Sequence, residues 1–213
     1  MGGWGWDEDP PSPRDVRLFE NARRVYDRIS DLVEIPGYPQ DTFTVTPTLV
    51  CEFHGIATAG EPDPRLIPGR LRTADVQIGR VVVQHEPPPW QQVPALLEEA
   101  CAYMNDALAA LRVLHAAAYA LWRINWIHPF GDGNGKTARA VMYAILCVGY
   151  GQMLPGTLAL PDRIARNPYA YYDALDSADD AWKRGTIDVS EMESLLESLL
   201  EQQVQGAALD SVA

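Results

Sequence analysis

The sequence lacks any apolar run of about 18 residues, which is the length that a helix needs to span a bilayer. Basic residues are also scarce, since 17 Lys and Arg stand against 29 Asp and Glu and leave a formal net charge of −12. Nucleic acids and anionic membranes bind basic surfaces. The composition therefore predicts no nucleic-acid partner and no membrane partner, while a local site for a small anion stays open.

Cysteine is rare as well, and its spacing excludes a disulfide framework. The three cysteines lie far apart, without a CxxC pair, at Cys51, Cys101 and Cys147. Free buried thiols in a reducing compartment explain them best, so we expect a cytoplasmic protein. His54 and His85 show no ligand spacing with each other, and the sequence predicts no zinc site.

Length and apolar periodicity predict one main domain with short flanking segments. Residues 1–13 carry glycines, prolines and two tryptophans, lack the apolar core of a signal peptide, and are expected to form a disordered leader. Residues 14–43 should hold an amphipathic helix, Asp15–Glu34, and its connection. Residues 44–205 form the predicted main domain, and residues 206–213 a tail.

The main domain is expected to be all-α, a helical bundle with one small β-hairpin. Thr46 followed by Pro47 is a helix start. Apolar spacing predicts further helices over Leu96–Asn105, Ala107–Trp126, Ile164–Leu175 and Val189–Gln203. The one convincing β region is Leu66–Val83, with its turn at Gly79 and Arg80.

One segment of twelve residues concentrates reactive side chains between two apolar runs. It is His-Pro-Phe-Gly-Asp-Gly-Asn-Gly-Lys-Thr-Ala-Arg, residues 128–139, and this placement suggests an active-site loop. Its glycines allow tight turns and close approach to a ligand. A helix is predicted after Asn134, which would be the N-cap. The amides of Gly135 to Thr137 would then be free to bind an anion.

The charged residues of this segment point to phosphate chemistry. Lys136 and Arg139 share one helix face and can bind the same phosphate. Asp132 would repel that phosphate unless a divalent ion such as Mg²⁺ lay between them. His128, with a side-chain pKa near neutrality, is the candidate general base. These residues predict transfer of a phosphorus-bearing group to a hydroxyl, with Phe130 anchoring the loop in the core.

A P-loop is the competing interpretation, and two observations exclude it. The Gly135-Lys136-Thr137 element needs a glycine five residues earlier, where this sequence has Phe130. A P-loop also follows a β-strand, whereas a helix is predicted before this segment.

The segment HPFGDGNGKTAR closely resembles the motif of the Fic family, HxFx[D/E]GN followed by Gly, an Arg, two residues and a second Arg. The likeness extends to Gly69–Gly79, which is similar to the family's flap hairpin, and to the proline run His85–Pro89. It covers roughly Thr44 to Ser177. The resemblance implies the helical Fic fold and a protein adenylyltransferase, which moves AMP from ATP–Mg²⁺ to a Ser, Thr or Tyr hydroxyl of a target protein.

The resemblance also implies roles for individual residues. His128 would deprotonate the target hydroxyl and Asp132 would hold Mg²⁺. The remaining motif residues would bind the phosphates, with Arg139 on the γ-phosphate and the α- and β-phosphates on Gly133, Asn134 and Gly135. The sequence departs from the family at Lys136, where an Arg is usual. Lysine keeps the charge but loses the planar fork that fixes phosphate geometry.

Two other functions stay open. A phosphotransferase of the Doc kind binds the nucleotide in reverse and replaces the Gly after the motif Asn with Lys, so Gly135 favours AMP transfer. A non-catalytic binding module with the same fold is the second. For partners, the resemblance implies a target docked on the flap around Leu71–Val83. It leaves open a homodimer, a separate inhibitory antitoxin, and a role as a bacterial toxin or an effector delivered into a host cell.

Members of the family often carry an inhibitory helix. Its motif is Ser or Thr, three residues, Glu, and then Gly or Asn, and the nearest match in this sequence is Ser30–Glu34. Ile35 follows that glutamate, so we predict no internal inhibitory helix.

Overall fold

The computed structural model describes residues 12–34, 43–63, 66–78, 85–156 and 158–210, with the side chains of residues 208–210 excepted. Its helices are α1 (Pro13–Glu34), α2 (Pro47–Ala57), α3 (Val93–Ala109), α4 (Val113–Ile127), α5 (Asn134–Gly149), α6 (Leu160–Arg166), α7 (Pro168–Lys183) and α8 (Ser190–Asp210), with a short 3₁₀ turn, η2 (Trp90–Gln92), before α3. The described residues contain no β-strand. The predicted helical bundle is therefore confirmed.

The predicted β-hairpin is not seen. Residues 66–78 form turns and bends, and the expected turn at Gly79 and Arg80 lies outside the described residues, as do residues 81–83. The segment 70–74 is tied to the loop after α4 instead of to a second strand, through a hydrogen bond from Arg72 N–H to the carbonyl of Pro129 (2.9 Å). Strand-forming side chains did not outweigh these tertiary contacts.

Several helix boundaries differ from the sequence prediction. The helix predicted over Ile164–Leu175 is two helices, because Pro168 lacks a backbone N–H and Asn167 before it has a non-helical φ of −132°. The predicted central helix begins at Val113 instead of Ala107, since α3 continues to Ala109. Likewise α8 runs on to Asp210, through residues predicted to be tail.

Other local predictions are confirmed. Thr46 is the N-cap of α2, and its side chain accepts a hydrogen bond from Leu49 N–H (3.1 Å). The three cysteines are free thiols. Burial raises the pKa of the Cys101 thiol to about 12 and that of Cys147 to about 11, so both are protonated at neutral pH. No helix among the described residues is long and apolar enough to cross a bilayer.

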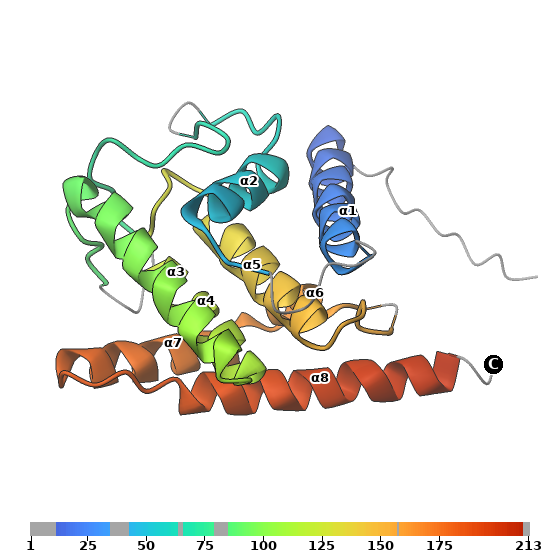
Figure 1. The fold of residues 1–213 in the computed structure, drawn as a ribbon. Helices are drawn as coiled ribbons and strands as arrows, with labels where there is room; N and C mark the ends of the chain where they lie inside the picture. The colour runs from blue at the N-terminus through green and yellow to red at the C-terminus, as the bar shows by residue number, and fades with distance from the viewer. Residues whose placement is uncertain (1–11, 35–42, 64–65, 79–84, 157, 211–213) are drawn as a thin grey trace, which may run out of the picture.

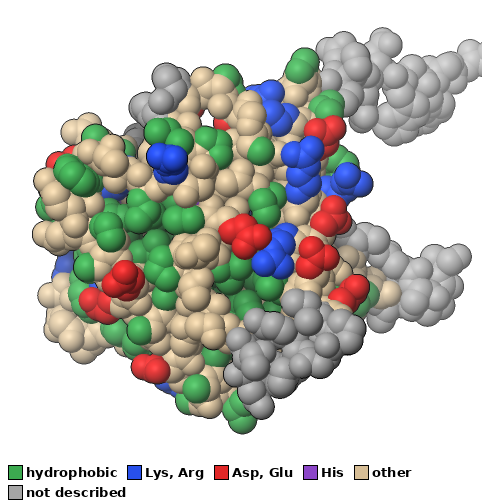
Figure 2. Space-filling model, turned by 45° about the horizontal axis from the view of Figure 1, so that its top comes forward, with side chains coloured by type: hydrophobic (Ala, Val, Ile, Leu, Met, Phe, Trp, Pro, Cys, Tyr) green, Lys and Arg blue, Asp and Glu red, His purple; other side chains and the backbone are tan. Residues whose placement is uncertain are grey.

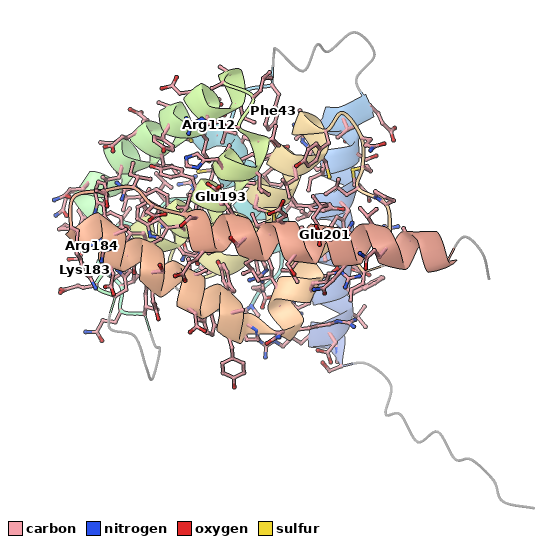
Figure 3. All side chains as sticks on the ribbon, turned by 90° about the horizontal axis from the view of Figure 1, so that it is seen from below. Phe43, Arg112, Lys183, Arg184, Glu193 and Glu201 are labelled. Carbon is pink, nitrogen blue, oxygen red and sulfur yellow. The ribbon has the colours of Figure 1, made fainter. Side chains whose placement is uncertain are left out.

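Two helices, α4 and α5, form the centre of the bundle, and α5 also contacts α1, α2 and α6 (Figure 1). Most of their residues are buried. The long α8 lies across α4, α6 and α7 (Figures 1 and 3). The loop between α4 and α5, which carries the candidate active site, is therefore held at the ends of the two most buried helices.

Structural contacts were predicted for four polar residues at and along α4, and His115, Tyr119 and Arg123 make them. His115 lies between the hydroxyl of Tyr103 (2.9 Å) and the carboxylate of Glu193. Glu193 sits on the side of α8 that faces the start of α4, where Arg112 is found (Figure 3). The guanidinium of Arg123 is buried between the rings of three tryptophans, Trp122, Trp126 and Trp182. The acidic net charge does not gather into one patch on the face of Figure 2, where side chains of both signs are interspersed.

Candidate active site

The candidate base, His128, ends α4 in a left-handed conformation, with φ of 51°. Its Nδ1 lies 3.3 Å from the carbonyl oxygen of Asn125. A carbonyl can only accept, so Nδ1 carries the proton and Nε2 keeps its lone pair. Burial lowers the pKa of His128 to about 4, and the positive charge of Arg72 contributes to the lowering. The imidazole is therefore neutral at pH 7, as a general base must be.

A cavity of about 140 Å³ borders His128. Aromatic and carboxylate side chains line it, including Trp126, Asp176 and Asp179. His85 also lines it and lies with Nε2 2.7 Å from the carbonyl oxygen of Trp126. The base thus faces a space large enough for part of a ligand, with acidic groups on its walls.

Arg72 holds the backbone around His128. It is 7% exposed, and its guanidinium donates to the carbonyl oxygens of His128 (2.8 Å), Ala74 (3.1 Å), Ile127 (3.4 Å) and Pro88. One side chain therefore joins the segment after Gly69, the proline run and the end of α4. This role could not be predicted from the sequence, because the partners lie up to 56 residues away in the chain.

His54 of α2 was also missed by sequence reasoning, although it supports the loop directly. Its ring stacks on Phe130, with centroids 3.7 Å apart and planes within 1°. Its Nδ1 accepts a hydrogen bond from Gly69 N–H (2.9 Å), so Nε2 carries the proton and donates to the carbonyl of Asp132 (3.0 Å). Burial lowers the pKa of His54 and favours this neutral form. Phe130 itself is fully buried, as predicted.

Asn134 does not have the N-cap role that the sequence predicted. Its side chain closes the loop, since Oδ1 accepts from Phe130 N–H (2.9 Å) and Nδ2 donates to the Phe130 carbonyl (3.0 Å). The N-cap is Gly133 instead. The amide of Thr137, expected to be free, donates to the Gly133 carbonyl (3.0 Å). Within the described residues, the N–H groups of Asn134, Gly135 and Lys136 have no backbone acceptor and can face an anion.

Glycine occupies positions 133 and 135 of the loop for different physical reasons. Gly133 has φ of +79°, and a Cβ there would lie 2.5 Å from Cγ2 of Thr58, so packing against α2 demands glycine. At Gly135 a Cβ would lie 3.4 Å from Nη1 of Arg139. A side chain at position 135 would therefore begin in contact with the Arg139 guanidinium, which glycine avoids.

Asp132 is exposed, and its Oδ1 accepts a hydrogen bond from Gly133 N–H (2.7 Å). The described residues contain no cluster of three or more metal-ligating side chains. A single accessible carboxylate beside a phosphate site suits Mg²⁺, which keeps most of its waters and is bound through one or two carboxylates plus phosphate oxygens. The donor set therefore fits a magnesium ion that arrives with the nucleotide.

The two cations lie on one face of α5, as predicted, and border a cavity of about 200 Å³ between α1, α5 and α6. Lys136 forms an ion pair with Glu61, with Nζ 3.1 Å from Oε1. Among the described residues no carboxylate lies within ion-pair distance of Arg139. Sequence reasoning missed Glu61, which follows α2 in the chain.

Residues 44–146 match the sequence profile of the Fic/DOC family. The chain contains a Fic domain. Curated relatives include the protein adenylyltransferase fic-1 of Caenorhabditis elegans, 33% identical over 88 residues, which are 41% of this chain and 16% of the relative. The protein adenylyltransferase Fic of Nematostella vectensis is 34% identical over 116 residues, 52% of this chain and 23% of the relative. The match thus spans less than a quarter of either relative.

Solved structures share the fold of this Fic domain. A Fic family protein from Desulfovibrio desulfuricans superposes with a TM-score of 0.69 at 22% identity, over 96% of this chain and 56% of that one. A Fic domain containing signaling protein from Bacteroides thetaiotaomicron gives a TM-score of 0.68 at 16% identity, over 94% of this chain and 75% of that one. The helical bundle around α4 and α5 is therefore the Fic fold.

The Arg72 contacts predict a stability effect. Replacing Arg72 by Gln would leave several buried carbonyl groups without a donor, and we expect a loss of about 2 kcal/mol or more of unfolding free energy in urea titrations. Arg70→Gln is the matched control, because Arg70 is exposed and should shift the unfolding free energy by less than about 0.5 kcal/mol. Equal effects of the two substitutions would contradict the assigned contacts.

The lowered pKa of His128 predicts a pH effect on stability. The ordinary value is 6.5 and the folded value about 4, so below pH 6.5 the unfolded chain binds a proton that the folded protein does not. The contribution of neutral His128 to the unfolding free energy is fully present above pH 6.5 and is lost as the pH falls toward 4. Between pH 7 and pH 5 the wild type should lose about 2 kcal/mol more than His128→Gln. An identical loss in both proteins would mean that His128 titrates normally.

Proposed function

We propose that this Fic domain transfers AMP from ATP to a hydroxyl side chain of a target protein. The observation that carries the proposal is the position of a neutral imidazole, with Nε2 unprotonated, one short loop before a helix N-terminus with open amides. The first feature can accept a proton from a hydroxyl, and the second can bind a phosphate chain. The names of the curated relatives, protein adenylyltransferases, support the same activity.

The steps follow from these groups. The amides at the start of α5 and the Arg139 guanidinium would hold the phosphates, with the α-phosphorus nearest His128. Nε2 of His128 would take the proton as the target oxygen bonds to the α-phosphorus, and the bond from the α-phosphorus to the bridging oxygen would break to release pyrophosphate. A magnesium ion held by Asp132 would supply positive charge to the departing pyrophosphate.

Gly135 supports AMP transfer over the Doc-like reaction. Gly135 has no side chain between the helix start and the Arg139 guanidinium, so the phosphate chain can approach the backbone closely. A lysine side chain at this position, as in the Doc branch, would fill that space. The binding module is disfavoured because His128 is held in a reactive tautomer that a mere scaffold would not need.

We further propose that the target binds over the segment that begins at Leu71, as the family resemblance implies. Arg72 joins this segment to the carbonyl of His128, so a chain lying on it would be close to the base. The second half of the expected docking segment, residues 79–83, lies outside the described residues. Two further partners, a separate antitoxin and a second copy of this chain, are proposed on the family resemblance alone.

The position of the label separates the reactions. The purified chain and a cell lysate are incubated with ATP labelled at either the α- or the γ-phosphate, and protein-bound label is counted. We expect label from the α position and none from the γ position. The reverse pattern would show a phosphotransferase.

His128→Ala is the control for that experiment. It should lose protein labelling while ATP affinity, measured by calorimetry, stays within about twofold, because a base acts in the chemical step. Absence of label from both positions, in lysates and in auto-modification, would favour the binding module.

A further inference from the structure

Glu61 places a poorly solvated carboxylate beside the phosphate site. It follows the turn after α2, where Glu61 N–H donates to the Thr58 carbonyl (3.2 Å). Its side chain is 11% exposed, against 37% for the side chain of Lys136, and the two meet at 3.1 Å. The carboxylate is thus the less solvent-exposed partner of this ion pair.

The formal charges around the start of α5 cancel because of Glu61. Lys136 and Arg139 contribute two positive charges, and Asp132 and Glu61 two negative ones. With Lys136 paired, Arg139 is the cation of this group without a carboxylate partner among the described residues. An arriving phosphate would therefore meet the backbone amides and one unpaired guanidinium. The sequence had predicted two available cations, Lys136 and Arg139.

The ion pair with Glu61 matters more because residue 136 is a lysine and not an arginine. A guanidinium presents five N–H donors in a planar fork and can bind a carboxylate and a phosphate together. An ammonium is a compact point charge, and its one positive charge is already neutralised by Glu61. Phosphate oxygens therefore have to compete with the Glu61 carboxylate for the same group.

We propose that Glu61 sets the phosphate affinity of this site by holding Lys136 in an ion pair that the nucleotide must displace. The inference rests on the nucleotide site of the proposed function and adds the residue that tunes it. Glu61 is a positioning residue in this account, because it acts through Lys136 and not on the reacting atoms.

A double-mutant cycle on nucleotide binding tests the inference. The probe is α,β-methylene-ATP with MgCl₂, which cannot release AMP, and the dissociation constant is measured by calorimetry at fixed ionic strength. Glu61→Gln should tighten binding about tenfold, because Lys136 would then bind a phosphate oxygen without first breaking an ion pair. In a Lys136→Met background the same substitution should change the constant by less than about twofold.

Glu52→Gln is the matched control, because Glu52 forms a similar ion pair with Arg28 between α1 and α2 (2.6 Å), away from the loop. It should leave nucleotide affinity unchanged. Unchanged or weaker binding in Glu61→Gln would overturn the inference, as would an equal gain with Lys136→Met present. If neither the wild type nor any variant binds the probe, the nucleotide site and the inference both fail. Measured binding without α-label transfer would defeat the proposed function alone.

Discussion

The geometry of the site depends on one clasp, the pair of hydrogen bonds between the Asn134 side chain and the backbone of Phe130. The clasp closes the loop between α4 and α5 on itself, with Phe130 buried against His54 and the first amides of α5 without a backbone acceptor among the described residues. Because the amide side chain satisfies both a donor and an acceptor of the buried backbone, the loop leaves regular structure at little cost in hydrogen-bond energy. The functional side chains are then held by a rigid backbone.

Burial and charge balance give the site its chemistry. A partly enclosed imidazole stays neutral because solvent cannot stabilise its charged form, and its Nδ1 proton is committed to the carbonyl of Asn125. The proposed phosphate site, by contrast, combines helix amides with Arg139 and a lysine already paired to Glu61. In the proposed reaction the base would be neutral before substrate arrives, whereas one of the two cations of the anion site would still be paired, so nucleotide binding would be the step that the protein moderates.

The sequence predicted the helical bundle and the reactive loop because both depend on local pattern. The 128–139 segment carries its chemistry in consecutive residues, and the helices follow apolar periodicity. Long-range contacts were not predictable in the same way. Three residues that contact the loop, His54, Glu61 and Arg72, are distant from it in the chain. The strand-forming residues of Leu66–Val83 predicted a hairpin that the described residues do not show. Asn134 was wrongly predicted to be the N-cap of α5, because an N-cap and the observed loop hydrogen bonds use the same kind of side chain.

The central claim is that the start of α5 binds a nucleoside triphosphate with its α-phosphorus next to the base. A crystal structure of the protein with α,β-methylene-ATP and Mg²⁺ tests it most directly. The account predicts phosphate oxygens on the amides of Gly135 and Lys136, the metal ion on Asp132, and the α-phosphorus as the phosphorus nearest Nε2 of His128. A nucleotide bound with its γ-phosphorus nearest Nε2, or bound away from α5, would contradict it.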